Sequence, residues 1–204
     1  MNEVGHLEHT LQDALDTIAP QGLRVGVLAI DDRYLSGLFD GERRHVSAAT
    51  GTRQHEFATG RELLRRLLGE RFEIAVLPSR APAVPLGMVA TLAHDRDVAV
   101  AAVGPVTAFT ALGIDVEPVG AMTLDEAATV LRTDEAGLDP CLGLVLKEAA
   151  YKAWSGLGGG LLDFHDVHVA VADDHYLATI LPAGRVLTGR WVEIGRRYLA
   201  LIAG

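Results

Sequence analysis

The sequence predicts one folding unit of mixed α and β structure, because of its length, its composition and two kinds of apolar periodicity. A chain of 204 residues has the size of one compact domain. Its 49% hydrophobic and 22% charged residues are enough to bury a sizeable core. Apolar residues recur at helical spacing in residues 7–18 and form a short continuous run in residues 23–30, which indicates both helices and strands.

The first half of the chain is expected to contain two helices and three strands. A helix over residues 7–18 leads into a strand over 23–30. The clearest helix covers residues 53–68, because apolar and basic residues occupy opposite sides and Gly69 is a typical stop. Three prolines within residues 78–85 exclude a helix or an inner strand, so this segment is an extended loop. Two further strands are expected over residues 88–93 and 98–103.

The second half of the chain is expected to be rich in strands. Residues 112–117 alternate apolar and polar before Pro118, which indicates a strand with one solvent-facing side. Helical spacing recurs over residues 124–131 and 142–154. The remaining strands are expected over residues 167–171, 176–181, 185–194 and 198–202.

Charge and cysteine content exclude several classes of function. A formal net charge of -9 gives a long-range field of the wrong sign for a general binder of nucleic acid or anionic membranes, so neither partner is expected. The single cysteine, Cys141, leaves no internal disulfide and no site with several thiolate ligands. The first residues lack a basic segment followed by an apolar run, and no stretch reaches the ~18 apolar residues of a membrane span. We expect a cytoplasmic protein.

Two acidic residues share one face of the strand expected over residues 112–117. Asp115 and Glu117 are two positions apart, so their Cα atoms lie ~6.5–7 Å from each other while Ile114 and Val116 face the core. Paired carboxylates on a rigid element are the hard oxygen ligands that Mg²⁺ accepts. The alternative is a solvated strand face with two ordinary acids.

A second charged pattern lies on the helix expected over residues 142–154. Glu148 and Lys152 are four positions apart and therefore neighbours on one helix face. Such a pair is commonly a surface stabiliser worth a few tenths of a kcal/mol, and Tyr151 and Trp154 beside it are equally consistent with core residues. The motif begins 30 residues after Glu117, with a helix-sized segment between.

Basic residues gather on the helix over residues 53–68. At ~100° per residue, Arg53, Arg61 and Arg65 fall within a sector of roughly 120°, so they could converge on one anion. Such clustering is unexpected in a protein of net charge -9. The alternative is a solvated helix face. His94 taken alone is typical of a hydrogen-bonded core or strand-edge histidine.

In their order along the chain, these segments resemble the 4'-phosphopantetheinyl transferase superfamily. Its hallmark is a Gly-Ile/Val-Asp-x-Glu strand followed by a Lys-Glu-x-x-x-Lys helix, and both are complete here at residues 113–117 and 147–152. Arg53 with residues 60–69 is similar to the basic helix of the siderophore-synthase-associated branch. The resemblance covers about half the chain and includes a histidine strand and a glycine-rich continuation, at residues 85–94 and 156–163.

Three positions depart from the family pattern. Ala93 stands where a hydroxyl residue usually precedes the histidine. Val84 replaces the usual aromatic residue before the proline, and Leu144 replaces the usual aromatic residue before the helix motif. The chain therefore resembles a divergent member of this family.

The resemblance implies an α+β fold of two pseudo-symmetric halves, each an antiparallel sheet with packed helices, with the ligand in the cleft between them. Residues 1–107 would form the N-terminal half with the basic helix and the histidine strand. Residues 108–204 would form the C-terminal half with the acids and the Lys-Glu-x-x-x-Lys helix. A monomer is expected.

The resemblance also implies an activity, a metal and a set of site residues. The expected reaction transfers the 4'-phosphopantetheine arm of coenzyme A to a serine of an apo acyl, aryl or peptidyl carrier protein and releases adenosine 3',5'-bisphosphate. Mg²⁺, or Mn²⁺ in its place, would be held by Asp115, Glu117 and Glu148. Glu148 and Lys152 would be catalytic. The phosphates of coenzyme A would be bound by Arg53, Arg61, Arg80 and His94.

Two other functions remain open from the sequence. One is a coenzyme A binding homologue without transferase activity, which the substitutions at Ala93 and Leu144 suggest. The other is a metal-dependent phosphohydrolase that uses the same acids and needs no acceptor protein. Within the order of motifs, a ligand-binding role for His94 is favoured.

Overall fold

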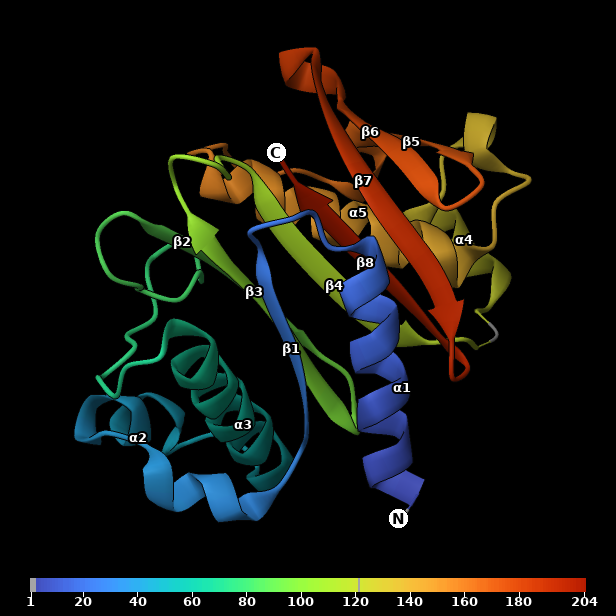
Figure 1. Ribbon diagram of the computed structural model, residues 1–204. Helices are drawn as coiled ribbons and strands as arrows, with labels where there is room; N and C mark the ends of the chain where they lie inside the picture. The colour runs from blue at the N-terminus through green and yellow to red at the C-terminus, as the bar shows by residue number, and fades with distance from the viewer. Residues whose placement is uncertain (1–2, 121) are drawn as a thin grey trace.

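Two antiparallel sheets form the framework of the computed structural model, which describes residues 3–120 and 122–204 (Figure 1). The three-stranded sheet has the order β1-β3-β2, and the five-stranded sheet has the order β4-β8-β7-β6-β5. The strands are β1 (Arg24–Ala29), β2 (Met88–His94), β3 (Val98–Pro105), β4 (Leu112–Pro118), β5 (Val167–Ala172), β6 (His175–Ile180), β7 (Arg185–Ile194) and β8 (Arg197–Ala203). The expected α+β class with two antiparallel sheets is confirmed.

The helices begin and end where local capping favours it. In α3, the Thr50 side chain accepts a hydrogen bond from the amide of Arg53, and Gly69 ends the helix in the left-handed region at φ 76°. In α5, Asp139 caps the first turn and Pro140 occupies it without losing a hydrogen bond. Within the described residues the α-helices are α1 (Glu3–Ile18), α2 (Asp40–Val46), α3 (Gly51–Leu68), α4 (Leu124–Val130) and α5 (Pro140–Gly156).

The two sheets share one core and each carries a second core on its outer face. The shared core contains Leu11 and Leu15 of α1, residues of β1 to β3, and Ile114 and Leu201 of the larger sheet. The outer face of the smaller sheet packs against α3, and the outer face of the larger sheet packs against α5. Figure 1 shows α1 running along the junction, with α3 and α5 on opposite outer sides. The layers are therefore helix, sheet, shared core, sheet and helix.

Strand β4 lies beside β2 at the junction of the two sheets. The amide of Ile114 on β4 donates to the hydroxyl of Thr91 on β2 over 3.2 Å, and Thr91 is buried. The carbonyl of Gly204 accepts hydrogen bonds from the amides of Thr110 and Ala111, each over 2.6 Å, which holds the chain end against the start of β4. The junction therefore places the end of the histidine strand next to the strand that carries Asp115 and Glu117.

Most of the expected elements are present, and the differences below lie in the first half of the chain. The helix α2 and a 3₁₀ turn over Asp32–Gly37 were not expected, because both are short and lack a sustained apolar period. The segment expected to be an extended loop at 78–85 instead begins within a small hairpin, in which Val76 and Pro82 form an isolated bridge. In the described part of the chain, no helix is both long and apolar enough to cross a membrane.

Candidate active site

Helix α5 lies unusually close to β4, and a glycine permits this approach. A Cβ atom at Gly113 would lie 1.9 Å from the carbonyl oxygen of Ala149 and 2.8 Å from the amide nitrogen of Ala153, so only glycine fits there. Ala149 and Ala153 are themselves small and fully buried. This close packing brings the side of α5 that carries Lys152 onto the acidic face of β4.

Lys152 and Asp115 form an ion pair between these two elements. The Nζ atom of Lys152 lies 2.6 Å from Oδ1 of Asp115 and donates to the carbonyl oxygen of Ile114 over 3.0 Å. Asp115 is only 6% exposed, and its second oxygen, Oδ2, has no hydrogen-bond partner. Burial raises the pKa of Asp115 to about 6, against the opposing charge of Lys152.

The surface-pair alternative for Glu148 and Lys152 is wrong. Among the described residues no ion pair joins Glu148 to Lys152, because the ammonium group meets Asp115 on β4 instead. The solvated-face alternative for the strand is also wrong at Asp115, which is buried. As expected, Ile114 and Val116 face the core and are fully buried.

Glu117 and Glu148 complete a group of acids around Asp115. Burial is the main cause that raises the pKa of Glu117 to about 7, and the negative charges of Asp115, Asp95 and Glu148 raise it further. Glu148 also raises the pKa of Asp115. Close carboxylates in a partly buried place bind protons or cations more readily than isolated ones.

The acid group fits a hard divalent cation in its chemistry. Within residues 3–120 and 122–204, no three His, Cys, Asp or Glu side chains stand close enough together to hold a metal ion as they are. However, Asp115 has a buried oxygen without a hydrogen-bond partner, and the negative charge of Glu148 helps to raise the Asp115 pKa. These carboxylates are the ligand type that Mg²⁺ prefers. The three acids named from the sequence therefore offer the type of ligand atom that the ion needs.

The first lysine of the helix motif faces away from this group. Lys147 is fully buried, lies 2.6 Å from a carboxylate oxygen of Glu135, and donates to the carbonyl oxygens of Val130 over 2.8 Å and Phe164 over 3.0 Å. It therefore fastens α5 to the segments before and after it.

Arg53 and His94 meet at the other side of the junction. His94 is the last residue of β2, Arg53 lies in the first turn of α3, and Nη1 of Arg53 hydrogen-bonds Nε2 of His94. Glu56 lies 3.2 Å from Arg53 and 3.6 Å from Nδ1 of His94. Burial lowers the pKa of His94, and the charges of Arg53 and Lys152 lower it further. Sequence reasoning missed Glu56, although its position three residues after Arg53 was an available signal.

Arg61 and Arg65 do not lie on a solvated helix face. Arg61 is 3% exposed, donates from Nε to the carbonyl oxygen of Ile74 over 2.9 Å, and stacks 4.2 Å above the ring of Phe57. Burial lowers its pKa to about 10. Arg65 is buried in an ion pair with Glu42 of α2. The three arginines therefore do not converge on one external anion in this structure.

Arg80 lies apart from the other predicted phosphate ligands. It is exposed in the turn of the small hairpin that includes Val76 and Pro82, with a left-handed backbone at φ 69°. In the described part of the chain, no contact joins its side chain to Arg53 or His94.

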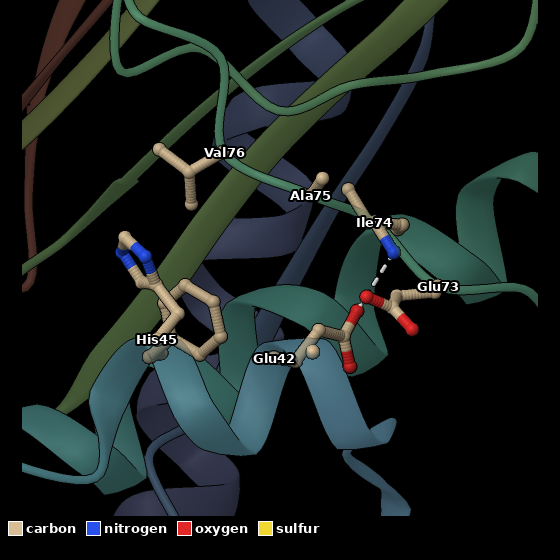
Figure 2. A pocket seen from close by; sticks show the side chains of 8 residues that line it. Glu42, His45, Glu73, Ile74, Ala75 and Val76 are labelled. Carbon is tan, nitrogen blue, oxygen red and sulfur yellow. Dashed lines mark hydrogen bonds between the residues drawn. The ribbon is translucent and has the colours of Figure 1, made fainter.

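A cavity of about 180 Å³ lies in the N-terminal half near Arg61, and none of Asp115, Glu117 and Glu148 lines it. Figure 2 shows it between α2, α3 and the chain before the small hairpin, with His45 and Glu73 among its walls. The amide of Ile74 donates to Glu42 over 2.8 Å, as the dashed line in Figure 2 marks. Two of the residues that line this cavity, Phe57 and Ile74, are the contacts of Arg61.

The sequence is similar to those of several known proteins. The sequence matches a model of the 4'-phosphopantetheinyl transferase N-terminal domain over residues 41–104. It is 36% identical over 182 residues to 4'-phosphopantetheinyl transferase Svp of Streptomyces mobaraensis, covering 79% of this chain and 73% of Svp. It is 32% identical over 190 residues to 4'-phosphopantetheinyl transferase PptT of Mycobacterium tuberculosis, covering 77% of this chain and 82% of PptT. It is 28% identical over 168 residues to 4'-phosphopantetheinyl transferase Npt of Nocardia iowensis, covering 76% and 75% of the two chains. The chain therefore belongs to the 4'-phosphopantetheinyl transferase family.

Proposed function

We propose that this protein is an enzyme that transfers the 4'-phosphopantetheine arm of coenzyme A to a serine of an apo acyl, aryl or peptidyl carrier protein. The observation that carries the proposal is the ion pair of Lys152 with the buried Asp115, set beside the Arg53 and His94 pair. Three relatives bear the name 4'-phosphopantetheinyl transferase, which favours transfer over a coenzyme-binding homologue and over a phosphohydrolase.

The binding of coenzyme A needs local positive charge in a protein of net charge -9. Lys152 supplies positive charge near Asp115 and the other acids, where we place the pyrophosphate. Arg53 and His94 supply positive charge for the remaining phosphate, which is on the ribose 3' oxygen. We propose Arg61 and Arg80 as further residues that bind the coenzyme. Arg61 supports the wall of the cavity near α3, and the side chain of Arg80 is exposed.

A divalent cation, Mg²⁺ or Mn²⁺, belongs to the proposal, with Asp115, Glu117 and Glu148 as the residues that would hold it. When bound, the ion would neutralise negative charge on the pyrophosphate. Asp115 is the natural anchor, because its Oδ2 atom has no partner and its other oxygen already meets a cation. Protons compete for the same oxygens, since the pKa values of Asp115 and Glu117 are raised to about 6 and about 7.

The chain's own residues perform the transfer in two roles. Glu148 accepts the proton of the carrier serine as the serine oxygen forms its bond to the phosphorus that bears the pantetheine arm. The bond from that phosphorus to the bridging oxygen breaks, and the electron pair leaves with adenosine 3',5'-bisphosphate. Lys152 donates to the oxygens on which this negative charge develops. Its ammonium group is held close to the acids, because it donates hydrogen bonds to the carbonyl oxygen of Ile114 and to the carboxylate of Asp115.

The proposal extends to organisation and location. We propose residues 1–107 and 108–204 as the two halves, with the coenzyme bound between them, in a cytoplasmic monomer. In support, the strands of one sheet come from residues 24–105 and those of the other from 112–203, and Cys141 is a free, buried thiol.

Incubation of an apo carrier protein with the enzyme, coenzyme A and Mg²⁺, followed by intact-mass analysis, tests the proposal. We expect one phosphopantetheine adduct, and none on a carrier whose acceptor serine is replaced by alanine. Tight binding of coenzyme A without an adduct would identify the inactive homologue. Cleavage of coenzyme A in the absence of any carrier would identify the phosphohydrolase.

A further inference from the structure

A buried ion cluster joins the two sheets a short distance from the candidate site. Arg197, the first residue of β8, directs Nε to Asp95 and Nη2 to Asp97, and Nη1 donates to the carbonyl of Gly195 over 3.4 Å. The side chains of Arg197 and Asp95 are 10% and 1% exposed, so this pair is shielded from water. Arg197 belongs to the larger sheet, and Asp95, 102 residues away in sequence, lies in the turn that joins β2 to β3 of the smaller sheet.

Asp95 is fixed from both of its oxygens. Its Oδ1 atom accepts hydrogen bonds from the amides of Asp97 over 2.7 Å and Val98 over 2.8 Å, which shapes the turn between β2 and β3. Its Oδ2 atom receives Arg197. The turn is also tied to β1, since the amide of Ile30 donates to the carbonyl of Asp97 over 2.8 Å. The histidine strand therefore ends in a rigid turn.

Arg197 is fixed from its own side by the larger sheet. In the β4 to β8 register it stands opposite Pro118, and the preceding pair is Glu117 opposite Tyr198. The hairpin that leads into it contains Gly195 and Arg196 in the left-handed region, at φ 58° and φ 60°. The cluster thus connects Asp95, which follows His94, with Arg197, which stands opposite the last residue of β4.

This position suggests a role beyond stability. A buried ion pair contributes little net stability compared with an apolar contact of the same size, but it holds its partners in one defined geometry. A planar guanidinium that bridges two carboxylates restricts direction as well as distance. Arg190 and Asp174 offer a contrast, because they form a more exposed pair, with Arg190 in the middle of β7 opposite His175.

We propose that Arg197 is a positioning residue. Through Asp95 and Asp97 it sets the distance between two sets of residues, the phosphate-binding residues at His94 and the acids at Glu117. The inference rests on the proposed function, because one coenzyme A would have to contact both sets at once. Arg197 touches neither the coenzyme nor the carrier in this role. Its loss should weaken ligands that span both sets more than ligands that reach only one.

The test compares a ligand that spans both sets with a ligand that reaches one. The double variant D95N/R197M removes the ion pair without leaving a buried charge, and the side-chain amide oxygen that replaces the Asp95 carboxylate can still accept the two backbone amides of the turn. We expect its dissociation constant for coenzyme A with Mg²⁺ to rise at least about tenfold, and that for adenosine 3'-monophosphate to change less than about twofold. R190Q is the matched control, in which both constants should stay at the parent values. Titration calorimetry gives both without any carrier protein.

Turnover and folding readouts separate positioning from simple stability. R197M alone leaves Asp95 buried and unpaired, so its melting temperature should fall, and D95N should restore much of it. A positioning role predicts that kcat/KM for coenzyme A stays low in the double variant although its fold is restored. If the folded double variant keeps both coenzyme affinity and kcat/KM within about threefold of the parent, the proposal is overturned.

Two further outcomes have a defined meaning. If the double variant does not fold, D97N decides, because Asp97 is 51% exposed and loses only one arm of the cluster. A selective weakening of coenzyme A by D97N would support the proposal, and unchanged affinity for both ligands would reject it. If the parent binds coenzyme A but modifies no carrier, the proposed function fails, while the comparison of the two ligands still judges the role of Arg197.

Discussion

Replacement of Lys152 by alanine separates a catalytic lysine from a surface lysine. In the structure Lys152 is the one charged partner of Asp115 among the described residues, and Asp115 is 6% exposed. Its removal leaves a buried carboxylate without its cationic partner, which costs about 1–3 kcal/mol of unfolding free energy. An exposed helix pair would cost only a few tenths of a kcal/mol.

The pH dependence of this loss follows from the pKa of Asp115. Its value of about 6 lies above the ordinary 3.8, so the folded state binds this proton more tightly than the unfolded chain does. Stability from this group is therefore full at low pH and falls as pH rises through 6. Without Lys152 the pKa rises further, so the variant should lose most stability at pH 8 and little at pH 5.

The effect on turnover should be larger than the effect on folding. Lys152 is expected to stabilise charge that develops only as the pyrophosphate bond breaks, and loss of such a contact lowers turnover by on the order of a hundredfold. A hundredfold loss corresponds to about 2.7 kcal/mol in the barrier. Affinity for coenzyme A should change much less than turnover.

Turnover is measured from the adduct formed per unit time at saturating Mg²⁺, coenzyme A and carrier, and stability from thermal unfolding at pH 5 and pH 8. Arg66→Ala is the control, because Arg66 and Glu62 form an exposed pair at the same four-residue spacing on α3. That variant should change neither quantity appreciably. Turnover of the Lys152 variant within about threefold of the parent would refute the catalytic role.

Three other predictions concern the metal, the phosphate residues and the packing of the helix. Apparent Mg²⁺ affinity, measured by calorimetry, should rise between pH 5.5 and 8 with release of protons, since Glu117 has a pKa of about 7 and protons compete with the ion; a pH-independent affinity would contradict this. Arg53→Ala should weaken coenzyme A binding about tenfold with little loss of stability. Arg65→Ala breaks a buried pair, so it should lower the free energy of unfolding, measured by thermal unfolding, by about 3–5 kcal/mol. Equal losses of affinity and equal losses of stability in the two variants would reject this distinction. Gly113→Ala should push α5 from β4, so that both stability and turnover fall, and an unchanged melting temperature would show that the close approach is not needed.

Sequence reasoning predicted the acid strand well because its signal is local. The alternation of residues 112–117 fixes which side chains face the core, and Ile114 and Val116 are buried as expected. The partner of Lys152 was not predictable in the same way. Helical spacing points to Glu148, but the actual partner depends on the close approach that Gly113 allows between two separate elements.

The environment of the basic helix was harder to predict. Arg65 is buried because Glu42 of α2 pairs with it, and α2 is a seven-residue helix with no apolar period that would reveal it. Arg61 is buried because it reaches the carbonyl of Ile74, a backbone contact with no sequence signal. The link of Arg197 to Asp95 joins residues 102 apart, so only the tertiary structure reveals it.

The most direct test of the central claim is a count of two products in one reaction. With enzyme, Mg²⁺, coenzyme A and an apo carrier protein, the account predicts one adenosine 3',5'-bisphosphate for each phosphopantetheine joined to the carrier serine. Glu148→Gln, which keeps the side chain's shape and removes its charge, should abolish both products together. Nucleotide released without a matching adduct, or no adduct on any carrier tested although coenzyme A binds, would contradict the account.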